Sequence, residues 1–501
     1  MFEKLLIANR GEIACRVIRT CRRLGISTVA IYSEADALAP HVALADEAYC
    51  VGPAPAKESY LNADAVLQIA VDTGADALHP GYGFLSENAG FARACAAVGV
   101  TFVGPSPDVI DRMGDKVGAR AAAVEAGLTL LPGSQDEVSD EEALAVAEGI
   151  GFPVMVKAAA GGGGIGMRVA RSGKELGEVL KGSRSLAENA FGSGKVYLER
   201  FVEKAAHVEI QIFGDSQGHI LHLNERDCST QRRHQKVIEE TPSPRLTEDL
   251  RSRMTEAALM LARHIGYTNA GTVEFIVDDE GRFYFLEVNT RLQVEHPVTE
   301  MVTGLDLVEL QLVVASGEPL SIAQGDVHSQ GHAIEARVYS EDPDTLFPTT
   351  GTISELLEPV GPHIRVDSGI AVGYEMSPYY DPMMAKLIVW GENRGEAVAR
   401  LDQALRQYRL RGFKCNIPLM LDILAHQDFI GGSYTTSVVE AVAEERASRG
   451  GDDKQTAAAV AVSLALELRR RAAVQRTSSS GSNWKREGLR SLMASRQAWS
   501  R

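Results

Sequence analysis

The stretch EVNTRLQVEHP, residues 287–297, alternates polar and mostly apolar side chains. In an extended chain, successive side chains point to opposite faces, so every second residue shares a face. The polar positions are Glu287, Asn289, Arg291, Gln293 and Glu295. The alternation predicts a strand that packs on a core through one face and presents acids, amides and a cation on the other. The alternative is a solvated strand face with charge pairs.

A β-hairpin is predicted over residues 271–290, with its turn at residues 279–281. A loop of two or four residues would preserve strand parity and place Glu274 on the same face as Glu287. Carboxylates this close raise one another's pKa unless a cation lies between them. Mg²⁺ prefers oxygen ligands, so the hairpin predicts a magnesium site. Arg291 adds a planar fork that suits an oxyanion.

A glycine-rich loop, KAAAGGGGIGM, occupies residues 157–167. Such a loop exposes backbone N–H groups and can fold over phosphates. It is not a P-loop, because no Gly-Lys-Ser/Thr ends it, and on its own it could equally be a flexible linker. Lys157 precedes the loop, and Lys116 opens the preceding segment. Two lysines, a glycine loop and a magnesium face together predict a nucleoside triphosphate site.

Strand and helix signals alternate in the first hundred residues. Strands are predicted at residues 4–9, 27–33, 75–80 and 100–106, which indicates a parallel α/β unit. No GxGxxG fingerprint is present, so a dinucleotide site is not supported. Later strands are predicted at residues 195–202, 207–215, 332–340, 363–369 and 385–391, and a helix at 394–410.

The composition of the 501 residues limits the class of protein. A net charge of -16 argues against general nucleic-acid binding. The six cysteines form no CxxC pair, so neither a zinc ribbon nor a disulfide framework is indicated. The first residues lack the apolar run of a signal peptide, and the apolar stretch at residues 457–468 is too short to span a bilayer. We expect a soluble protein of the cytoplasm, with no nucleic-acid or membrane partner.

Several motifs together resemble the biotin carboxylase family of the ATP-grasp superfamily. They are IANRGEIA, HPGYGFLSEN, MGDK, GGGGIGM, ERDCSTQRRHQKVIEE, EFI and EVNTRLQVEHPVTE. The resemblance runs from residue 1 to about residue 440 and implies an α/β (α+β) ATP-grasp fold. The implied parts are an N-terminal parallel α/β domain at 1–113, an ATP-grasp domain at 114–330 with a mobile lid at about 129–201, a C-terminal β-rich domain at 331–445 and an Ala/Arg/Ser-rich tail at 446–501.

The resemblance also implies a reaction and its residues. The reaction is ATP- and bicarbonate-dependent carboxylation of biotin through carboxyphosphate. The implied ATP-binding residues are Lys116, Lys157, Gly162, Gly163, Gly164, Gly166, Met167, Glu199, Val202, His207, Gln231, His234, Glu274, Ile276 and Glu287. Mg²⁺ or Mn²⁺ would be held by Glu274, Glu287 and Asn289. Bicarbonate would be bound by Lys236, Arg291, Gln293 and the backbone at Val294, and biotin by Tyr82 and Arg337.

Catalytic roles follow the same resemblance. Glu295 would be the base that deprotonates bicarbonate, with Arg291 and Lys236 beside it, and Arg337 would stabilise the biotin enolate. His207 and His234 could also be ordinary buried histidines. Two residues depart from the family pattern: Ile165 stands where a basic residue is common, and Ala160 replaces a glycine of some members. Both lie in the glycine loop, so they concern lid closure or phosphate contact.

No biotin-bearing Met-Lys stretch occurs in the chain. Biotin is therefore expected on a separate carrier protein or subunit, with a carboxyltransferase subunit as a further partner and a homodimer or higher oligomer as the assembly. The expected function is the first half-reaction of an acyl-CoA carboxylase of the acetyl-CoA or propionyl-CoA type. The alternatives are a pyruvate carboxylase subunit, a non-catalytic scaffold and an ATP-grasp ligase that joins a carboxylate to an amine.

The tail has a composition of its own. Residues 469–501 hold nine basic residues and one acid, and Trp484 and Trp499 lie among them. Trp and Arg are favoured anchors of protein interfaces, so the segment could dock on a partner subunit. The alternative is a disordered, solvated tail.

Overall fold

The computed structural model describes residues 1–134, 137–158, 167–233 and 235–448. Two units make up the chain, Met1–Val442 and Ala443–Arg501. The predictions for Ala160, Ile165, the glycines at 162, 163, 164 and 166, His234 and the basic tail lie outside the described residues. Within the described ranges, no helix has both the length and the apolar character needed to cross a membrane.

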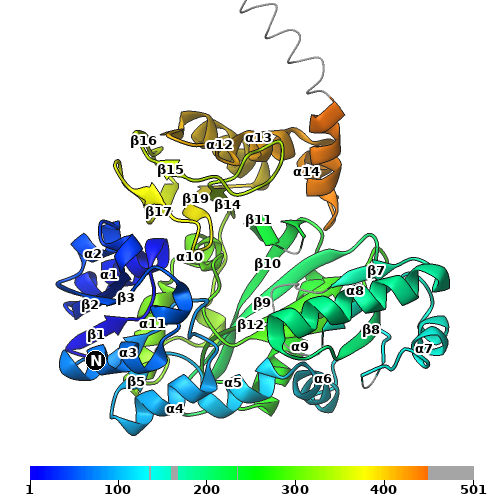
Figure 1. The fold of residues 1–501 in the computed structure, drawn as a ribbon, viewed down its shortest axis with the longest axis horizontal. Helices are drawn as coiled ribbons and strands as arrows, with labels where there is room; N and C mark the ends of the chain where they lie inside the picture. The colour runs from blue at the N-terminus through cyan, green and yellow to red at the C-terminus, as the bar shows by residue number, and fades with distance from the viewer. Residues whose placement is uncertain (135–136, 159–166, 234, 449–501) are drawn as a thin grey trace, which may run out of the picture. The chain divides into compact units, whose positions relative to one another are not determined.

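The N-terminal part is a parallel five-stranded sheet with helices around it (Figure 1), as the alternating signals predict. The strand order is β3-β2-β1-β4-β5. The strands are β1 (Lys4–Ile7), β2 (Ser27–Ser33), β3 (Glu47–Gly52), β4 (Ala77–His79) and β5 (Thr101–Phe102). The helices are α1 (Gly11–Leu24), α2 (Pro40–Leu44), α3 (Ala63–Asp72), α4 (Ala89–Ala97) and α5 (Pro107–Gly114). The strand β3 was not predicted. Helix α1 ends at Leu24, because Gly25 adopts a left-handed conformation with φ of 73°.

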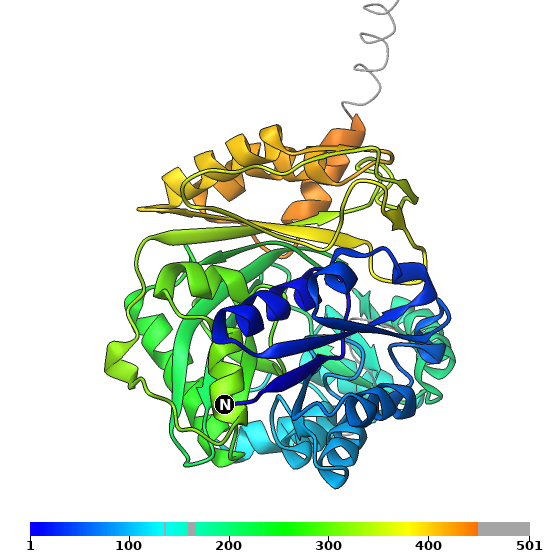
Figure 2. The same cartoon turned by 90° about the vertical axis from the view of Figure 1, so that its left-hand side faces the viewer.

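An antiparallel eight-stranded sheet forms the centre of the molecule, in the order β13-β12-β9-β10-β11-β14-β19-β17. Its strands are β9 (Ala206–Gly214), β10 (Ile220–Arg232), β11 (Gln235–Thr241), β12 (Asn269–Val277), β13 (Phe283–Asn289), β14 (His332–Tyr339), β17 (Ile364–Ser368) and β19 (Met383–Gly391). The associated helices are α9 (Glu248–His264), α10 (His296–Thr303), α11 (Leu307–Ala315), α12 (Arg394–Gln407), α13 (Ile417–Ala425) and α14 (Gln427–Gly431). Strands before and after residue 330 therefore belong to one sheet, and α12 and α13 cover one face of its C-terminal half (Figure 2).

A smaller three-stranded sheet lies within the predicted lid. It pairs β7 (Arg168–Ala170), β6 (Val154–Ala158) and β8 (Val196–Arg200), and its core includes side chains of α7 (Ala143–Ile150) and α8 (Gly173–Phe191). Helix α6 (Lys116–Glu125) precedes it. Two short strand pairs, β15 (Gly351–Thr352) with β18 (Glu375–Met376) and β16 (Glu355–Leu357) with β20 (Arg409–Arg411), complete the C-terminal part.

Strand alternation supplies the polar wall of the site. Along β9, Val208, Ile210 and Ile212 pack in one core with residues of α9. The residues that alternate with them, His207, Glu209 and Gln211, must face the other way, and all three are buried. The sheet therefore brings polar side chains into a low-dielectric interior, where each requires a partner.

The prediction of one continuous strand over residues 287–297 is wrong. Strand β13 ends at Asn289, residues 290–295 are irregular, and α10 begins at His296. The second residue of that helix is Pro297, a residue that suits a first helical turn and cannot donate to a strand ladder. The polar side chains of this stretch still converge on one site, but a loop and a helix start bring them there after the strand ends.

The hairpin is confirmed, but its register depends on a β-bulge. Its loop, residues 278–282, has five residues, not two or four. An odd loop in a regular ladder would place Glu274 opposite Leu286. The register shifts by one residue between Phe275 and Glu274, so that Glu274 lies directly opposite Glu287.

Gly271 in β12 is a position where the packing requires glycine. A Cβ there would lie 2.0 Å from the hydroxyl of Tyr267, a buried ring whose hydroxyl donates to the Ala270 carbonyl at 3.0 Å. We expect Gly271→Ala to lower the free energy of unfolding by about 1–3 kcal/mol, the cost of overpacking, measured as a lower melting temperature. Gly395→Ala, at an exposed site in α12 with only ordinary contacts, is the control. Equal losses in both variants would contradict this account.

Candidate functional site

One cavity of about 1270 Å³ collects the predicted site residues. Those that line it are Tyr82, Lys116, Lys157, Met167, Glu199, Val202, His207, Gln231, Lys236, Glu274, Ile276, Glu287, Asn289, Arg291, Gln293, Val294 and Arg337. Of the predicted residues that the structure describes, only Glu295 is not among them. Glu295 is completely buried and lies behind Lys236 and Arg337, which it contacts.

The two lysines predicted to contact phosphates lie in this cavity with different partners. Lys157 in β6 forms an ion pair of 2.5 Å with Glu199 in β8, and Arg120 also pairs with Glu199. Burial lowers the pKa of Lys157, but the charge of Glu199 outweighs burial and raises it. Lys116 donates to the Ala158 carbonyl at 3.3 Å, and burial lowers its pKa. Both lysines can therefore neutralise an anion, and the Glu199 carboxylate holds Lys157 in place.

The two carboxylates of the hairpin differ in their partners. The Glu274 carboxylate accepts hydrogen bonds from His207 at 2.8 Å, Lys236 at 2.8 Å, Asn289 at 2.9 Å and Gln293 at 3.0 Å. Although burial raises the pKa of Glu274, Lys236 and His207 hold it well below its usual value. Burial and the charge of Glu274 raise the pKa of Glu287. No hydrogen bond to the Glu287 carboxylate occurs among the described residues, so the two oxygens of Glu287 are available to bind a divalent cation.

Asn289, the third predicted metal ligand, already uses both polar atoms of its amide in hydrogen bonds. The amide nitrogen of Asn289 donates to Glu274, and its oxygen accepts a hydrogen bond of 3.0 Å from Arg291. A different donor set also exists, because ligand atoms of His207, Glu209 and Glu274 lie within 4.8 Å of one another. Lys236 already supplies positive charge between two members of that set.

His207 is buried, but it is not surrounded by apolar groups alone. Its Nε2 donates to Glu274, and its Nδ1 accepts a hydrogen bond of 3.3 Å from the Gln231 amide. Burial lowers the pKa of His207, but the nearby Glu274 charge outweighs burial and raises it. His207 is therefore a polar member of the cavity wall.

Glu295 lies between two cations at the start of α10. Lys236 Nζ donates to Glu295 at 2.6 Å, and also to Glu209 at 2.6 Å. Arg337 donates to the other Glu295 oxygen at 2.9 Å and to Glu239 at 2.5 Å. Burial raises the pKa of Glu295, but Lys236 and Arg337 outweigh it and hold that pKa below its usual value. In this state Glu295 is an anion and a weak base.

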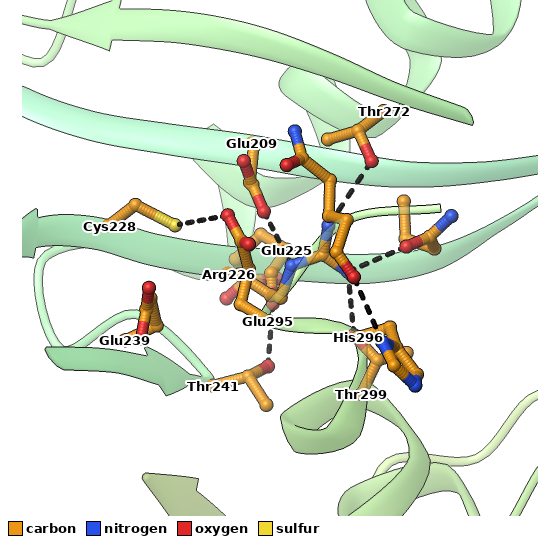
Figure 3. Close-up of polar contacts among 12 residues, drawn as sticks. Glu209, Glu225, Arg226, Cys228, Glu239, Thr241, Thr272, Glu295, His296 and Thr299 are labelled. Atoms are coloured by element: carbon orange, nitrogen blue, oxygen red, sulfur yellow. Dashed lines mark hydrogen bonds and ion pairs between the residues drawn. The ribbon is translucent and has the colours of Figure 1, made fainter. Parts of the chain in front are cut away.

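A completely buried arginine, Arg226, contacts the glutamate that holds Lys236. Arg226 donates to Glu209 at 2.5 Å and to Thr272 at 3.2 Å. Figure 3 shows it among these groups, with the Cys228 thiol directed at the Glu295 carboxylate at 3.7 Å. Arg226 therefore fixes Glu209, which in turn holds Lys236.

The loop that carries Arg291 and Val294 is held from both sides. Arg291 Nε donates to Glu87 at 2.9 Å, and Lys386 Nζ donates to the Val294 carbonyl at 2.7 Å. Lys386 also pairs with Glu12 at 3.2 Å. The Tyr82 hydroxyl donates to Glu12, and its ring centroid is 6.0 Å from Lys386 Nζ.

Several residues of the site were not predicted from the sequence. They are Glu12, Glu87, Glu209, Arg226, Glu239 and Lys386. Four of them lie inside the motifs that carry the resemblance: Glu12 in IANRGEIA, Glu87 in HPGYGFLSEN, and Arg226 and Glu239 in ERDCSTQRRHQKVIEE. Glu209 could have been predicted from strand alternation, because it lies two residues beyond His207 and therefore on the same face of the strand.

Family models match the chain in three consecutive pieces. "Biotin carboxylase, N-terminal domain" matches residues 1–110, "Carbamoyl-phosphate synthase L chain, ATP binding domain" matches 115–323, and "Biotin carboxylase C-terminal domain" matches 335–441. A biotin carboxylase of Halalkalibacterium halodurans is 54% identical over 440 residues, which cover 88% of this chain and 97% of that protein. The mouse mitochondrial propionyl-CoA carboxylase alpha chain is 50% identical over 445 residues, which cover 88% of this chain and 62% of that protein.

Solved structures show the same fold. The biotin carboxylase domain of Hydrogenobacter thermophilus 2-oxoglutarate carboxylase, a dimer with MgADP, ADP and bicarbonate, is 47% identical with a TM-score of 0.86, covering 88% of this chain and 98% of that one. A Campylobacter jejuni biotin carboxylase bound to a β-γ-ATP ligand is 43% identical with a TM-score of 0.86, covering 88% and 99%. The chain has the ATP-grasp biotin carboxylase fold, and it belongs to the biotin carboxylase family of ATP-dependent carboxylating ligases.

Proposed function

We propose that this chain uses ATP and bicarbonate to carboxylate biotin on a separate carrier protein, as the first half-reaction of an acyl-CoA carboxylase. One observation carries the proposal: Glu295 lies between Lys236 and Arg337, and Lys236 also bonds to Glu274. The two cations can bind an anionic substrate, and the Glu295 carboxylate between them can accept a proton from it. The neighbouring Glu274 and Glu287 carboxylates can hold a metal ion and its bound phosphate beside that substrate.

The phosphate end of the cavity fits ATP. Lys116 and Lys157 would neutralise phosphate oxygens, while Glu274 and Glu287 would hold Mg²⁺ or Mn²⁺. The metal, when bound, offsets negative charge on the transferred phosphoryl group. The raised pKa of Glu287 fits this role, because a nearby divalent charge would favour its ionised form.

The middle of the cavity fits bicarbonate. Arg291 and Lys236 would hold the bicarbonate anion. Glu295 would accept the proton of bicarbonate while an oxygen of bicarbonate attacks the γ-phosphorus and ADP leaves. Bicarbonate would draw Lys236 and Arg337 away from Glu295, and the loss of these partners would raise the pKa of Glu295. We infer that the substrate itself converts this weak base into a competent one. Carboxyphosphate then divides into CO₂ and phosphate.

The far end of the cavity fits the ureido ring of biotin. Arg337 would stabilise the negative charge that develops on the ureido oxygen, and the Tyr82 ring would line the pocket. Biotin would arrive on a carrier protein. A carboxyltransferase subunit would complete the assembly.

The relatives bear on the final acceptor of the carboxyl group. We favour an acetyl-CoA or propionyl-CoA type of carboxylase, supported by the similarity to propionyl-CoA carboxylase alpha chains. The alternative, a pyruvate carboxylase subunit, is supported by similarity to the biotin carboxylase subunit of a pyruvate carboxylase, 49% identical with a TM-score of 0.76. A homodimer is supported by the dimeric relative. Cytoplasmic placement is supported by six free cysteines.

The test is an assay of the purified chain with ATP, Mg²⁺, bicarbonate and free biotin. We expect ATP cleavage that depends on bicarbonate and carboxylated biotin as product. A scaffold would give neither. A ligase that joins a carboxylate to an amine would cleave ATP only with another acid. Identifying subunits that co-purify with the full chain would then assign the acceptor.

A further inference from the structure

Two buried glutamates beneath Arg337 have no role in the function described so far. Glu239 in β11 and Glu335 in β14 lie directly opposite each other in the antiparallel ladder, and both are completely buried. Among the described residues, no hydrogen-bond partner is found for Glu239 Oε2 or for either oxygen of Glu335. Buried polar atoms without partners are rare in native proteins, so these three oxygens require an explanation.

The charges around the pair come from every neighbouring element. Arg337 lies two residues beyond Glu335 on the same face of β14 and donates to Glu239 at 2.5 Å. The other titratable groups that act on the pair are Lys236 in β11, Cys228 in β10, Lys386 in β19, Tyr339 in β14, Tyr82, and Glu295 before α10. Two of these cations, Lys386 and Arg337, act on Glu335 itself.

Two ionised carboxylates cannot both persist in this position. Directly opposite residues have Cβ atoms about 4.5–5.5 Å apart, and in a dry interior their repulsion keeps one proton bound. Burial raises the pKa of Glu239 to about 7 and raises that of Glu335 well above its usual value. Glu335 is the member that holds the proton, because Glu239 accepts a hydrogen bond from Arg337, while Glu335 accepts none from the residues that the structure describes.

We propose that Glu239 and Glu335 are a carboxyl pair that retains one proton and positions Arg337 for the carboxyl-transfer step. Both are positioning residues, since they act through Arg337, and the inference rests on the proposed function for the role of that arginine. Glu239 orients the guanidinium. The neutral Glu335 leaves enough positive charge on Arg337 and Lys386 for an anion to be stabilised above them.

The pair gives carboxyl transfer a dependence on alkaline pH. Above the pKa of the pair, the retained proton is lost and a second negative charge lies beside Arg337. The enolate would then be less well stabilised, so carboxylation of biotin should fall. Glutamine at position 335 cannot lose that proton, and Glu335→Gln should therefore flatten this alkaline decline.

The direct test is infrared difference spectroscopy of the full chain at neutral pH. A protonated carboxyl has a carbonyl stretch distinct from that of a carboxylate, and we expect such a band to be lost in Glu335→Gln. The control is Glu225→Gln, at a completely buried glutamate whose carboxylate is bonded to Arg251 at 2.9 Å. The control should keep the band. If the parent has no band that Glu335→Gln removes, the proposal is wrong.

A second variant tests the positioning role. Glu239→Gln removes a charge-assisted hydrogen bond to Arg337, and we expect biotin carboxylation to fall by about ten- to a hundredfold. Bicarbonate-dependent ATP cleavage should change much less. Equal losses in both assays, or an unchanged alkaline decline in Glu335→Gln, would overturn the proposal. If the parent shows no bicarbonate-dependent ATP cleavage, the proposed function fails, and the infrared band still decides whether the pair retains its proton.

Discussion

Replacing Glu295 with glutamine is expected to reduce bicarbonate-dependent turnover by about 10²–10⁴-fold, the usual cost of losing a general base. Glutamine keeps the size of the side chain but cannot accept the proton of bicarbonate. Nucleotide affinity should change little, because the metal-facing carboxylates and the two phosphate lysines belong to other elements. The measurements are steady-state turnover and a nucleotide titration.

Glu225→Gln is the matched control for this variant, since it also removes one buried carboxylate paired with an arginine but lies outside the cavity. The control should retain parental turnover. Near-normal turnover of Glu295→Gln at neutral pH would show that another group takes the proton. A large loss of nucleotide affinity would place Glu295 in the metal site instead.

Arg337→Ala should separate the two halves of the reaction. Carboxylation of biotin is expected to fall by about 10²–10³-fold, the cost of removing one oxyanion donor. Cleavage of ATP with bicarbonate should fall less, because the enolate forms only after phosphoryl transfer and Glu295 keeps Lys236 as a partner.

Arg337→Lys refines this experiment, because it retains the charge but loses the planar fork that contacts Glu239 and Glu295 together. We expect an intermediate rate of carboxylation. If both substitutions reduce ATP cleavage and biotin carboxylation by the same factor, Arg337 mainly positions bicarbonate.

The sequence predicted the local parts of the site well. Strand alternation and the turn at residues 279–281 predicted that Glu274 and Glu287 share a face, and the structure shows the two residues directly opposite each other. The physical route was different, because a five-residue loop and a bulge replace an even loop. A one-residue bulge leaves no clear mark in hydrophobic periodicity. The shared face of Glu274 and Glu287 was predicted correctly only because the odd loop and the bulge together shift the register as an even loop would.

Contacts between distant strands could not be predicted in the same way. Glu239, Glu335 and Lys386 come from three strands that become neighbours only when the sheet forms. Their apolar neighbours give these segments the pattern of ordinary core strands, and a single charged residue within such a pattern does not reveal its partner. The strand predicted beyond Asn289 does not form, because Pro297 cannot donate to a strand ladder and suits the first turn of the helix that begins at His296.

Oxygen transfer from bicarbonate to phosphate tests the central claim most directly. The purified chain is supplied with ATP, Mg²⁺, free biotin and bicarbonate labelled with ¹⁸O, and the phosphate formed is analysed by mass spectrometry. If bicarbonate attacks the γ-phosphorus, one labelled oxygen must appear in each phosphate when carboxyphosphate divides. Phosphate that takes its oxygen from water alone, at a rate unaffected by bicarbonate, would contradict this account of the site.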